Sequence, residues 1–187
     1  MDANNLKILG IAGSLRDSSF NKALLKASIE LQPENMKIEE FDISPLPMYD
    51  EDVREEGDPP TVIQFKKKIA DSDGLLIVTP EYNYSIPGVL KNAIDWASRP
   101  PAETPLNKKP LAIMGATSGR MGTVRAQLHL RQIAVYTNMY TMNKPEVMIS
   151  NAKDKFDPEG KLIDKSTIEH VRKLLEAFAG WIIQLNK

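Results

Sequence analysis

The chain has 187 residues, 42% of them hydrophobic and 26% charged, with a formal net charge of -1. This balance is typical of a folded globular protein, and it provides no overall field that would attract nucleic acid. If the protein binds an anion, particular residues near that anion must bind it, because the overall charge does not attract it. The chain contains no cysteine, which excludes disulfides, zinc–thiolate sites and thiol catalysis, so redox chemistry would need a bound cofactor.

The opening residues lack the basic and then apolar pattern of a signal peptide, and no apolar run approaches the roughly 20 residues that span a bilayer. Together with the absence of cysteine, which fits a reducing compartment, this predicts a cytoplasmic protein without membrane insertion. We expect neither a nucleic-acid partner nor a bound metal ion.

The first third of the chain begins with a compact apolar run that predicts a strand over 6–12, ending at Gly13. A helix is expected over 19–31, with Ser18 or Ser19 as its N-cap, and alternating residues predict a strand over 36–41. The segment 42–60 contains four prolines and many acidic residues. It is predicted as a long loop, which either helps to cover a site or is a passive connection.

The rest of the chain continues the alternation of strands and helices. Apolar spacing predicts helices over 61–70, 87–98 and 122–138 and strands over 74–79, 111–116 and 142–149, the last of them interrupted by Pro145. Ser166 and Glu169 form a capping-box pattern that predicts the start of the final helix. Five strands alternating with five helices indicate a parallel sheet with helices on both faces, and no repeat or linker divides the expected domain, 1–187.

In such a sheet, ligands bind beyond the carboxyl ends of the strands. The loop after the first strand carries Ser14, Arg16, Ser19 and Asn21 before a helix N-terminus, which is suited to a phosphate. It lacks the Gly-rich dinucleotide and P-loop fingerprints, so a terminal phosphate monoester such as that of FMN suits it better. The alternative is a polar loop with a serine cap and a solvated arginine.

Two further loops follow strands at the same expected edge. The loop over 79–88 offers tyrosine rings and amide groups to a flavin ring. The alternative is a structural turn whose tyrosines only pack against the protein. The loop over 116–123 is small enough for close approach by a ligand. Its Arg120 is either a contact for the phosphates of a nicotinamide donor or a solvated side chain.

The segment Gly13-Ser14-Leu15-Arg16, the segment Ser19-Phe20-Asn21 and the longer segment from Pro80 to Trp96 together resemble the NADPH-dependent FMN reductase family, which includes bacterial quinone, azo-dye and chromate reductases. The resemblance implies a flavodoxin-like three-layer sandwich whose five-stranded parallel sheet has the order 2-1-3-4-5. It implies tight, non-covalent binding of FMN. The residues implied around the phosphate are Ser14, Arg16, Ser19, Phe20 and Asn21; those along the isoalloxazine are Pro80, Glu81, Tyr82 and Asn83, with Ser118 and Gly119 on its far side.

The expected activity is hydride transfer from NADPH or NADH through FMN to quinones, azo compounds or metal oxyanions. The cofactor carries this chemistry, so no catalytic side chain is named. Glu81 is expected to fix its loop or pair with a cation, and His129 and His170 to lie on helices in surface or capping roles. The alternatives are a non-enzymatic electron carrier and a flavin-free phosphate-binding module.

The resemblance also implies a homodimer or homotetramer with the flavin near a subunit interface. The helix that Pro87 opens is the expected pairing helix. The alternative is that this helix only packs inside the subunit.

Overall fold

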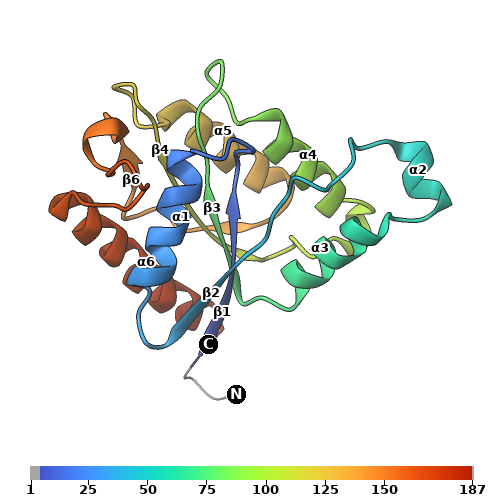
Figure 1. The fold of residues 1–187 in the computed structure, drawn as a ribbon. Helices are drawn as coiled ribbons and strands as arrows, with labels where there is room; N and C mark the ends of the chain where they lie inside the picture. Colours follow the sequence, from blue (N-terminus) through green and yellow to red (C-terminus); the bar gives the residue numbers. More distant parts are fainter. Residues whose placement is uncertain (1–4, 187) are drawn as a thin grey trace.

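The computed structural model describes residues 5–186 (Figure 1). Residues 1–4, on which the expectation of no signal peptide partly rests, and Lys187 lie outside the described residues. The elements are β1 (Leu6–Ala12), α1 (Phe20–Leu31), β2 (Met36–Glu40), α2 (Glu51–Glu56), α3 (Pro60–Ala70), β3 (Gly74–Val78), α4 (Gly88–Ala97), η1 (Pro101–Glu103), β4 (Pro110–Ala116), α5 (Val124–Tyr136), β5 (Tyr140–Thr141), β6 (Val147–Ile149), η2 (Ala152–Asp154) and α6 (Lys165–Leu185).

The strands form a parallel sheet in the order β2-β1-β3-β4-β5, which confirms the expected order. The last expected strand, 142–149, is wrong as a single element. It is replaced by two short strands, because β5 pairs with the start of β4 and β6 pairs with its end. Pro145 lies between them and has no backbone N–H to continue a ladder, so the sheet gains a sixth strand.

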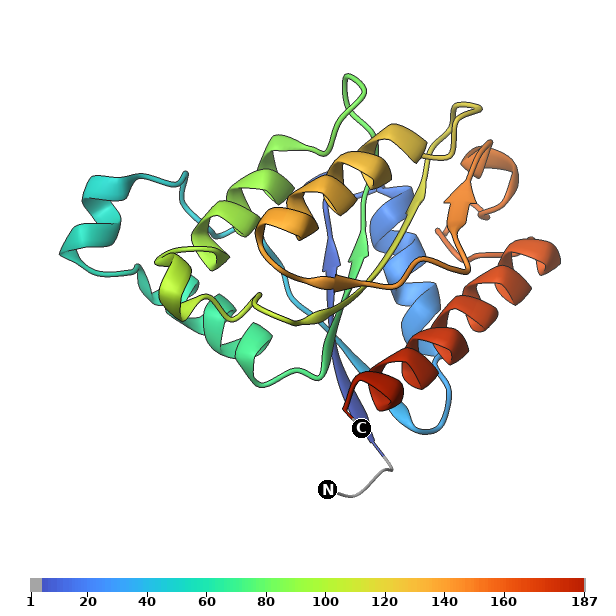
Figure 2. The same cartoon turned by 180° about the vertical axis from the view of Figure 1, so that it is seen from behind.

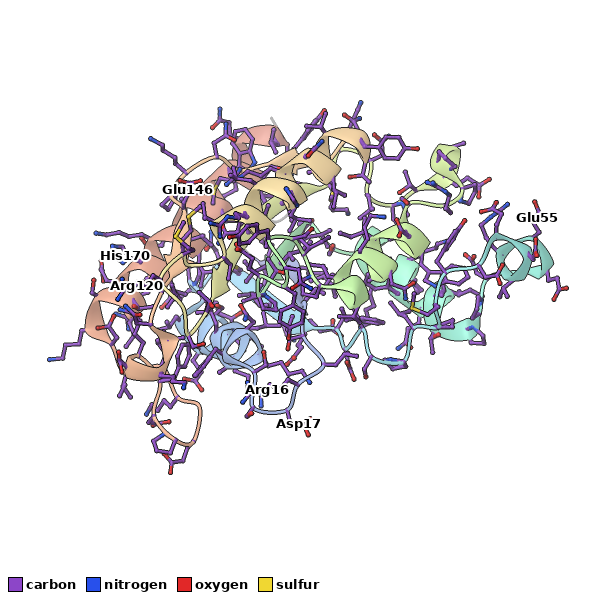
Figure 3. All side chains as sticks on the ribbon, turned by 90° about the horizontal axis from the view of Figure 1, so that it is seen from above. Arg16, Asp17, Glu55, Arg120, Glu146 and His170 are labelled. Atoms are coloured by element: carbon purple, nitrogen blue, oxygen red, sulfur yellow. The ribbon has the colours of Figure 1, made fainter. Side chains whose placement is uncertain are left out.

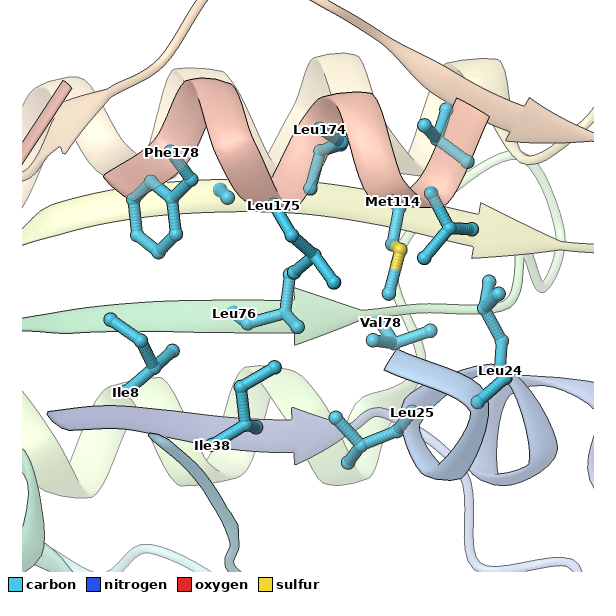
Figure 4. Packing of buried hydrophobic residues seen from close by; sticks show 14 of the residues in the cluster. Ile8, Leu24, Leu25, Ile38, Leu76, Val78, Met114, Leu174, Leu175 and Phe178 are labelled. Atoms are coloured by element: carbon cyan, nitrogen blue, oxygen red, sulfur yellow. The ribbon is translucent and has the colours of Figure 1, made fainter. Parts of the chain in front are cut away.

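Helices cover both faces of the sheet, as Figures 1 and 2 show from opposite sides. Alternate residues along each inner strand point to opposite faces. Ile8, Leu76 and Met114 pack with α1 and α6, as Figure 4 shows in part. Leu9 and Ile77 belong to the second core, which α3, α4 and α5 cover. The inner strands β3 and β4 are buried and apolar throughout, as expected of parallel strands covered on both faces, and the sheet is a rigid platform for the loops at its end.

Two sequence-based expectations about helix ends need correction. The segment 42–60 is not a continuous loop, because Asp50 caps the short helix α2 by accepting a hydrogen bond from the Asp52 N–H at 3.0 Å. The N-cap of helix α6 lies two residues before the first residue of the expected capping box. Asp164 accepts the Thr167 N–H at 2.9 Å and is its N-cap, so Ser166 lies inside the first turn.

The segment before α2 is fixed to α4. The carbonyl oxygen of Pro47 accepts hydrogen bonds from Asn92 Nδ2 and Trp96 Nε1, both at 2.8 Å, and the Tyr49 ring packs edge-on against Trp96. Figure 1 shows α2 at the side of the molecule beyond α4, away from the loops that follow β1, β3 and β4. Within residues 5–186, no helix has the length and apolar character needed to cross a membrane.

Candidate functional site

The three loops singled out in the sequence extend from the same end of the sheet. They follow β1, β3 and β4, which are adjacent parallel strands. Figure 1 shows all three at the top of the molecule. A ligand at this end would therefore contact segments that are far apart in the sequence, as in other open parallel sheets.

The first loop presents unused backbone donors at the start of α1. Ser19 is the N-cap, as expected, and its hydroxyl accepts the N–H groups of Asn21 and Lys22. Within the described chain, the backbone N–H groups of residues 14–18 donate no hydrogen bond. Free N–H groups beside the positive end of a helix are the donors that a phosphate needs.

Side chains of the same loop differ in how they are placed. Ser14 is buried, whereas Arg16 is exposed and donates from Nε to Ser18 Oγ at 2.9 Å. Seen from above the sheet end, Arg16 and Asp17 lie on the outside of the loop (Figure 3). A cavity of about 730 Å³ borders this loop and is lined by Arg16, Ser19 and Phe20 together with residues near η2. Arg16 therefore lies between this cavity and solvent, with only its Nε used in a hydrogen bond within the described chain.

Asn21 has a structural role that the sequence did not indicate. Its side-chain Nδ2 donates to the Ala116 carbonyl, and its Oδ1 accepts the Ala116 N–H, both at 2.9 Å. Strand β3 ends at Val78, so these two groups at the end of β4 have no neighbouring strand on that side. The Asn21 amide replaces that strand and joins α1 to β4. The backbone N–H of Asn21 is used as well, because it donates to the Ser19 hydroxyl at 3.2 Å.

The second loop contains a two-residue hairpin. Tyr82 and Ser85 exchange backbone hydrogen bonds at 3.0 Å in both directions. Asn83 and Tyr84 between them have φ values of 50° and 66°. Positive φ at both central positions is typical of a type I′ turn, in which asparagine is favoured at the first position but glycine is usual at the second, where this chain has Tyr84. We call residues 80–87 the hairpin segment; its Tyr82, Asn83 and Tyr84 are exposed.

Glu81 points toward helix α5 and serves as its cap. Its carboxylate accepts the backbone N–H groups of Arg125 and Ala126 at 2.9 and 3.3 Å, and it pairs with the Arg125 guanidinium at 3.0 Å. Thr123, the residue at the N-cap position, has a φ of 65° and makes no capping bond of its own. The expectation that Glu81 fixes its loop or pairs with a cation agrees with these contacts.

Arg125 and His129 are contacts that the sequence reasoning missed. The Arg125 guanidinium lies 3.9 Å from the centre of the Tyr84 ring, and His129 Nδ1 lies 3.0 Å from Ser85 Oγ. Their spacing of four residues places both on one face of α5. The four-residue spacing is visible in the sequence, but the sequence does not show that this face of α5 packs against the hairpin segment. His129 and His170 lie on α5 and α6, as expected.

The third loop is held by the segment around η2. The Gly119 carbonyl accepts the Asn151 N–H at 3.0 Å, and the Gly119 N–H donates to Thr117 Oγ1 at 3.2 Å. Ser118, Gly119 and Arg120 are all exposed. The loop therefore has a fixed backbone and accessible side chains at the edge where a ligand would lie.

Comparison with known proteins identifies the family of the chain. Residues 6–154 match the model of the NADPH-dependent FMN reductase family. The chain belongs to this family. It is 52% identical over 184 residues to an NAD(P)H-dependent FMN reductase of Pseudomonas aeruginosa, a match covering 98% of this chain and 99% of the relative. It is 43% identical to the quinone reductase of Escherichia coli K12, covering 96% and 97% of the two chains.

Among solved structures, the flavoenzyme NAD(P)H:acceptor oxidoreductase FerB of Paracoccus denitrificans is similar with a TM-score of 0.88 and 32% identity, covering 96% of this chain and 98% of FerB. The fold is thus flavodoxin-like, and as a family member the protein is an FMN-dependent oxidoreductase with NAD(P)H as donor. The residues present fit this cofactor, because the free N–H groups of residues 14–18 suit its phosphate.

Proposed function

We propose that the protein reduces quinones with electrons from NADPH or NADH, using FMN bound across the three loops. One observation carries the proposal: the free N–H groups at the start of α1 lie at the same sheet end as the hairpin segment. A phosphate held at the first loop would direct the rest of FMN along this edge, toward the second and third loops.

In this proposal, residues 14–21 bind the phosphate through backbone N–H groups, Ser14, Ser19 and Arg16, with Phe20 beside them. Pro80 to Asn83 line the isoalloxazine, and Ser118 and Gly119 contact its far side. When bound, FMN supplies the redox chemistry, accepting hydride from the nicotinamide and passing electrons to the acceptor. The chain orients the two flat molecules against each other and excludes water.

Quinones are the proposed acceptors because two similar proteins are described as quinone reductases. The chain is 44% identical to a 2-hydroxy-1,4-benzoquinone reductase of Burkholderia, and 43% identical to the quinone reductase noted above. Azo compounds and metal oxyanions are further acceptors to be compared in the same assay. The exposed, aromatic hairpin segment favours flat acceptors over small ions.

The test is stopped-flow absorbance of the FMN-loaded protein mixed anaerobically with NADPH, and separately with NADH. Rapid loss of the oxidised flavin band, followed by its return when a quinone is added, is the expected result. If FMN binds but neither nucleotide reduces it, the protein is an electron carrier. A protein that binds no FMN would overturn both the function and the site.

We also propose that two copies pair through α5. Val135 and Tyr136 are 80% and 72% exposed, and Leu128 on the same helix is also exposed. Helix α4 is the expected pairing helix, but its apolar stripe is largely buried in the second core, so α5 offers more exposed apolar surface for pairing. Residues 1–187 are proposed to form one cytoplasmic FMN-binding domain, since both cores share one sheet.

A further inference from the structure

Helix α5 contacts the hairpin segment at Glu81, Tyr84 and Ser85, and Arg125 makes the first two of these contacts. Its guanidinium pairs with Glu81, which precedes the turn, and it lies over the ring of Tyr84 at the tip. One helical turn later, His129 contacts Ser85 on the returning limb. A single cation therefore contacts both the base and the tip of the hairpin.

The turn itself needs this support. Asn83 and Tyr84 both occupy the left-handed region, with φ of 50° and 66°. Asparagine adopts this conformation more readily than other non-glycine residues, but a bulky residue such as Tyr84 persists there only when surrounding contacts favour it. Within the hairpin only the two Tyr82–Ser85 backbone bonds close the turn. Contacts with α5 supply the remaining constraint.

From these contacts we propose that Arg125 is a positioning residue for the FMN ring, acting through the hairpin segment rather than by touching the flavin. This inference rests on the proposed site, in which residues 80–83 line the isoalloxazine. Removal of the guanidinium leaves the Glu81 carboxylate bound to two backbone N–H groups of α5, so the helix cap survives. The tip at Tyr84 loses its partner, so the turn must become ordered when FMN binds, and this ordering weakens FMN binding.

The test compares R125M with R131M and R125K in the full chain. Arg131 is a matched control, because it is on the same helix but donates to the Met142 carbonyl at 3.1 Å, away from the hairpin. In R125M, we expect the dissociation constant for FMN, measured by fluorescence quenching, to rise about tenfold, because part of the free energy lost with one charged hydrogen bond and one cation–π contact must then come from FMN binding. R125K should recover part of the loss.

In the FMN-loaded variants, R125M should raise the KM for a quinone more than it lowers kcat, and should alter the visible circular dichroism of bound flavin. R131M should do neither, even where its thermal stability falls as far. If R125M and R131M have the same FMN affinity and the same flavin spectrum, Arg125 has no positioning role.

Y82A separates failure of this inference from failure of the site. If Y82A changes the bound-flavin spectrum while R125M does not, the hairpin lies at the flavin and only the positioning role is refuted. If neither variant changes the spectrum, the hairpin does not lie against the flavin, and the site assignment falls together with the inference.

Discussion

The Asn21 amide allows a direct test of whether this residue serves the fold or the phosphate. The side chain is 3% exposed and makes two hydrogen bonds with the backbone of Ala116. Asn21→Ala would leave a buried N–H and a buried C=O without partners, at about 1–3 kcal/mol each. Taking about 3 kcal/mol in total, the melting temperature of the apoprotein should fall by about 6–12 °C for a domain of this size.

The assay is thermal unfolding without FMN, followed by titration of each variant with FMN. Asn92→Ala is the matched control, because Asn92 is 5% exposed and also bridges two backbone groups, the Tyr49 N–H at 2.7 Å and the Pro47 carbonyl at 2.8 Å. It should lower the melting temperature by a similar amount with FMN affinity unchanged. A melting temperature for Asn21→Ala within about 2 °C of the wild type, with FMN affinity reduced a hundredfold, would refute the structural role and favour direct contact with the phosphate.

Further predictions concern backbone geometry, acid stability and assembly. Gly122 has a φ of 57°, and a Cβ there would lie 2.8 Å from the Met148 backbone. Gly122→Ala should cost about 2–4 kcal/mol in denaturant unfolding, whereas Gly119→Ala should cost far less, because a Cβ there would make only an ordinary contact with Thr117 Oγ1 at 3.6 Å. Hydrogen bonds from Thr167 and then Lys155 lower the pKa of Asp164 to about 2. Because the pKa of Asp164 is lower in the folded state, its ionised carboxylate stabilises the fold above the ordinary pKa of 3.8, and this stabilisation is lost as the pH falls toward 2. Asp164→Asn should therefore make the free energy of unfolding fall less steeply between pH 4 and 2. An unchanged slope would contradict this. Val135→Glu should shift the mass measured by light scattering toward the monomer, and an unchanged mass would place the interface elsewhere.

The elements that could be predicted from the sequence are those with strong local signals. A serine before an apolar helical period predicts the cap of α1 as Ser18 or Ser19, and the structure has Ser19. The buried strands β3 and β4 are continuous apolar runs. The short helix α2 was missed because its six residues carry no buried position. Two cap patterns lie close together at α6, and Asp164 with Thr167 prevailed over the expected pair.

The candidate site was predictable in position but less so in the roles of its side chains. Parallel strands bring their carboxyl ends together, so the three loops could be placed at one edge. The bond between Asn21 and Ala116 spans 95 residues, and that between Glu81 and Arg125 spans 44. No local pattern encodes such pairs, because each depends on where a neighbouring strand ends or a helix begins.

The placement of Glu81 also bears on which acceptors the protein can use well. Its carboxylate already neutralises the positive end of α5 and the charge of Arg125. That helix end is thus closed to a second anion. A dianionic oxidant such as chromate would gain no electrostatic attraction there, whereas an uncharged quinone would lose none. We therefore expect turnover of neutral aromatic acceptors to be insensitive to ionic strength, and catalytic efficiency to decline as the acceptor becomes more negative.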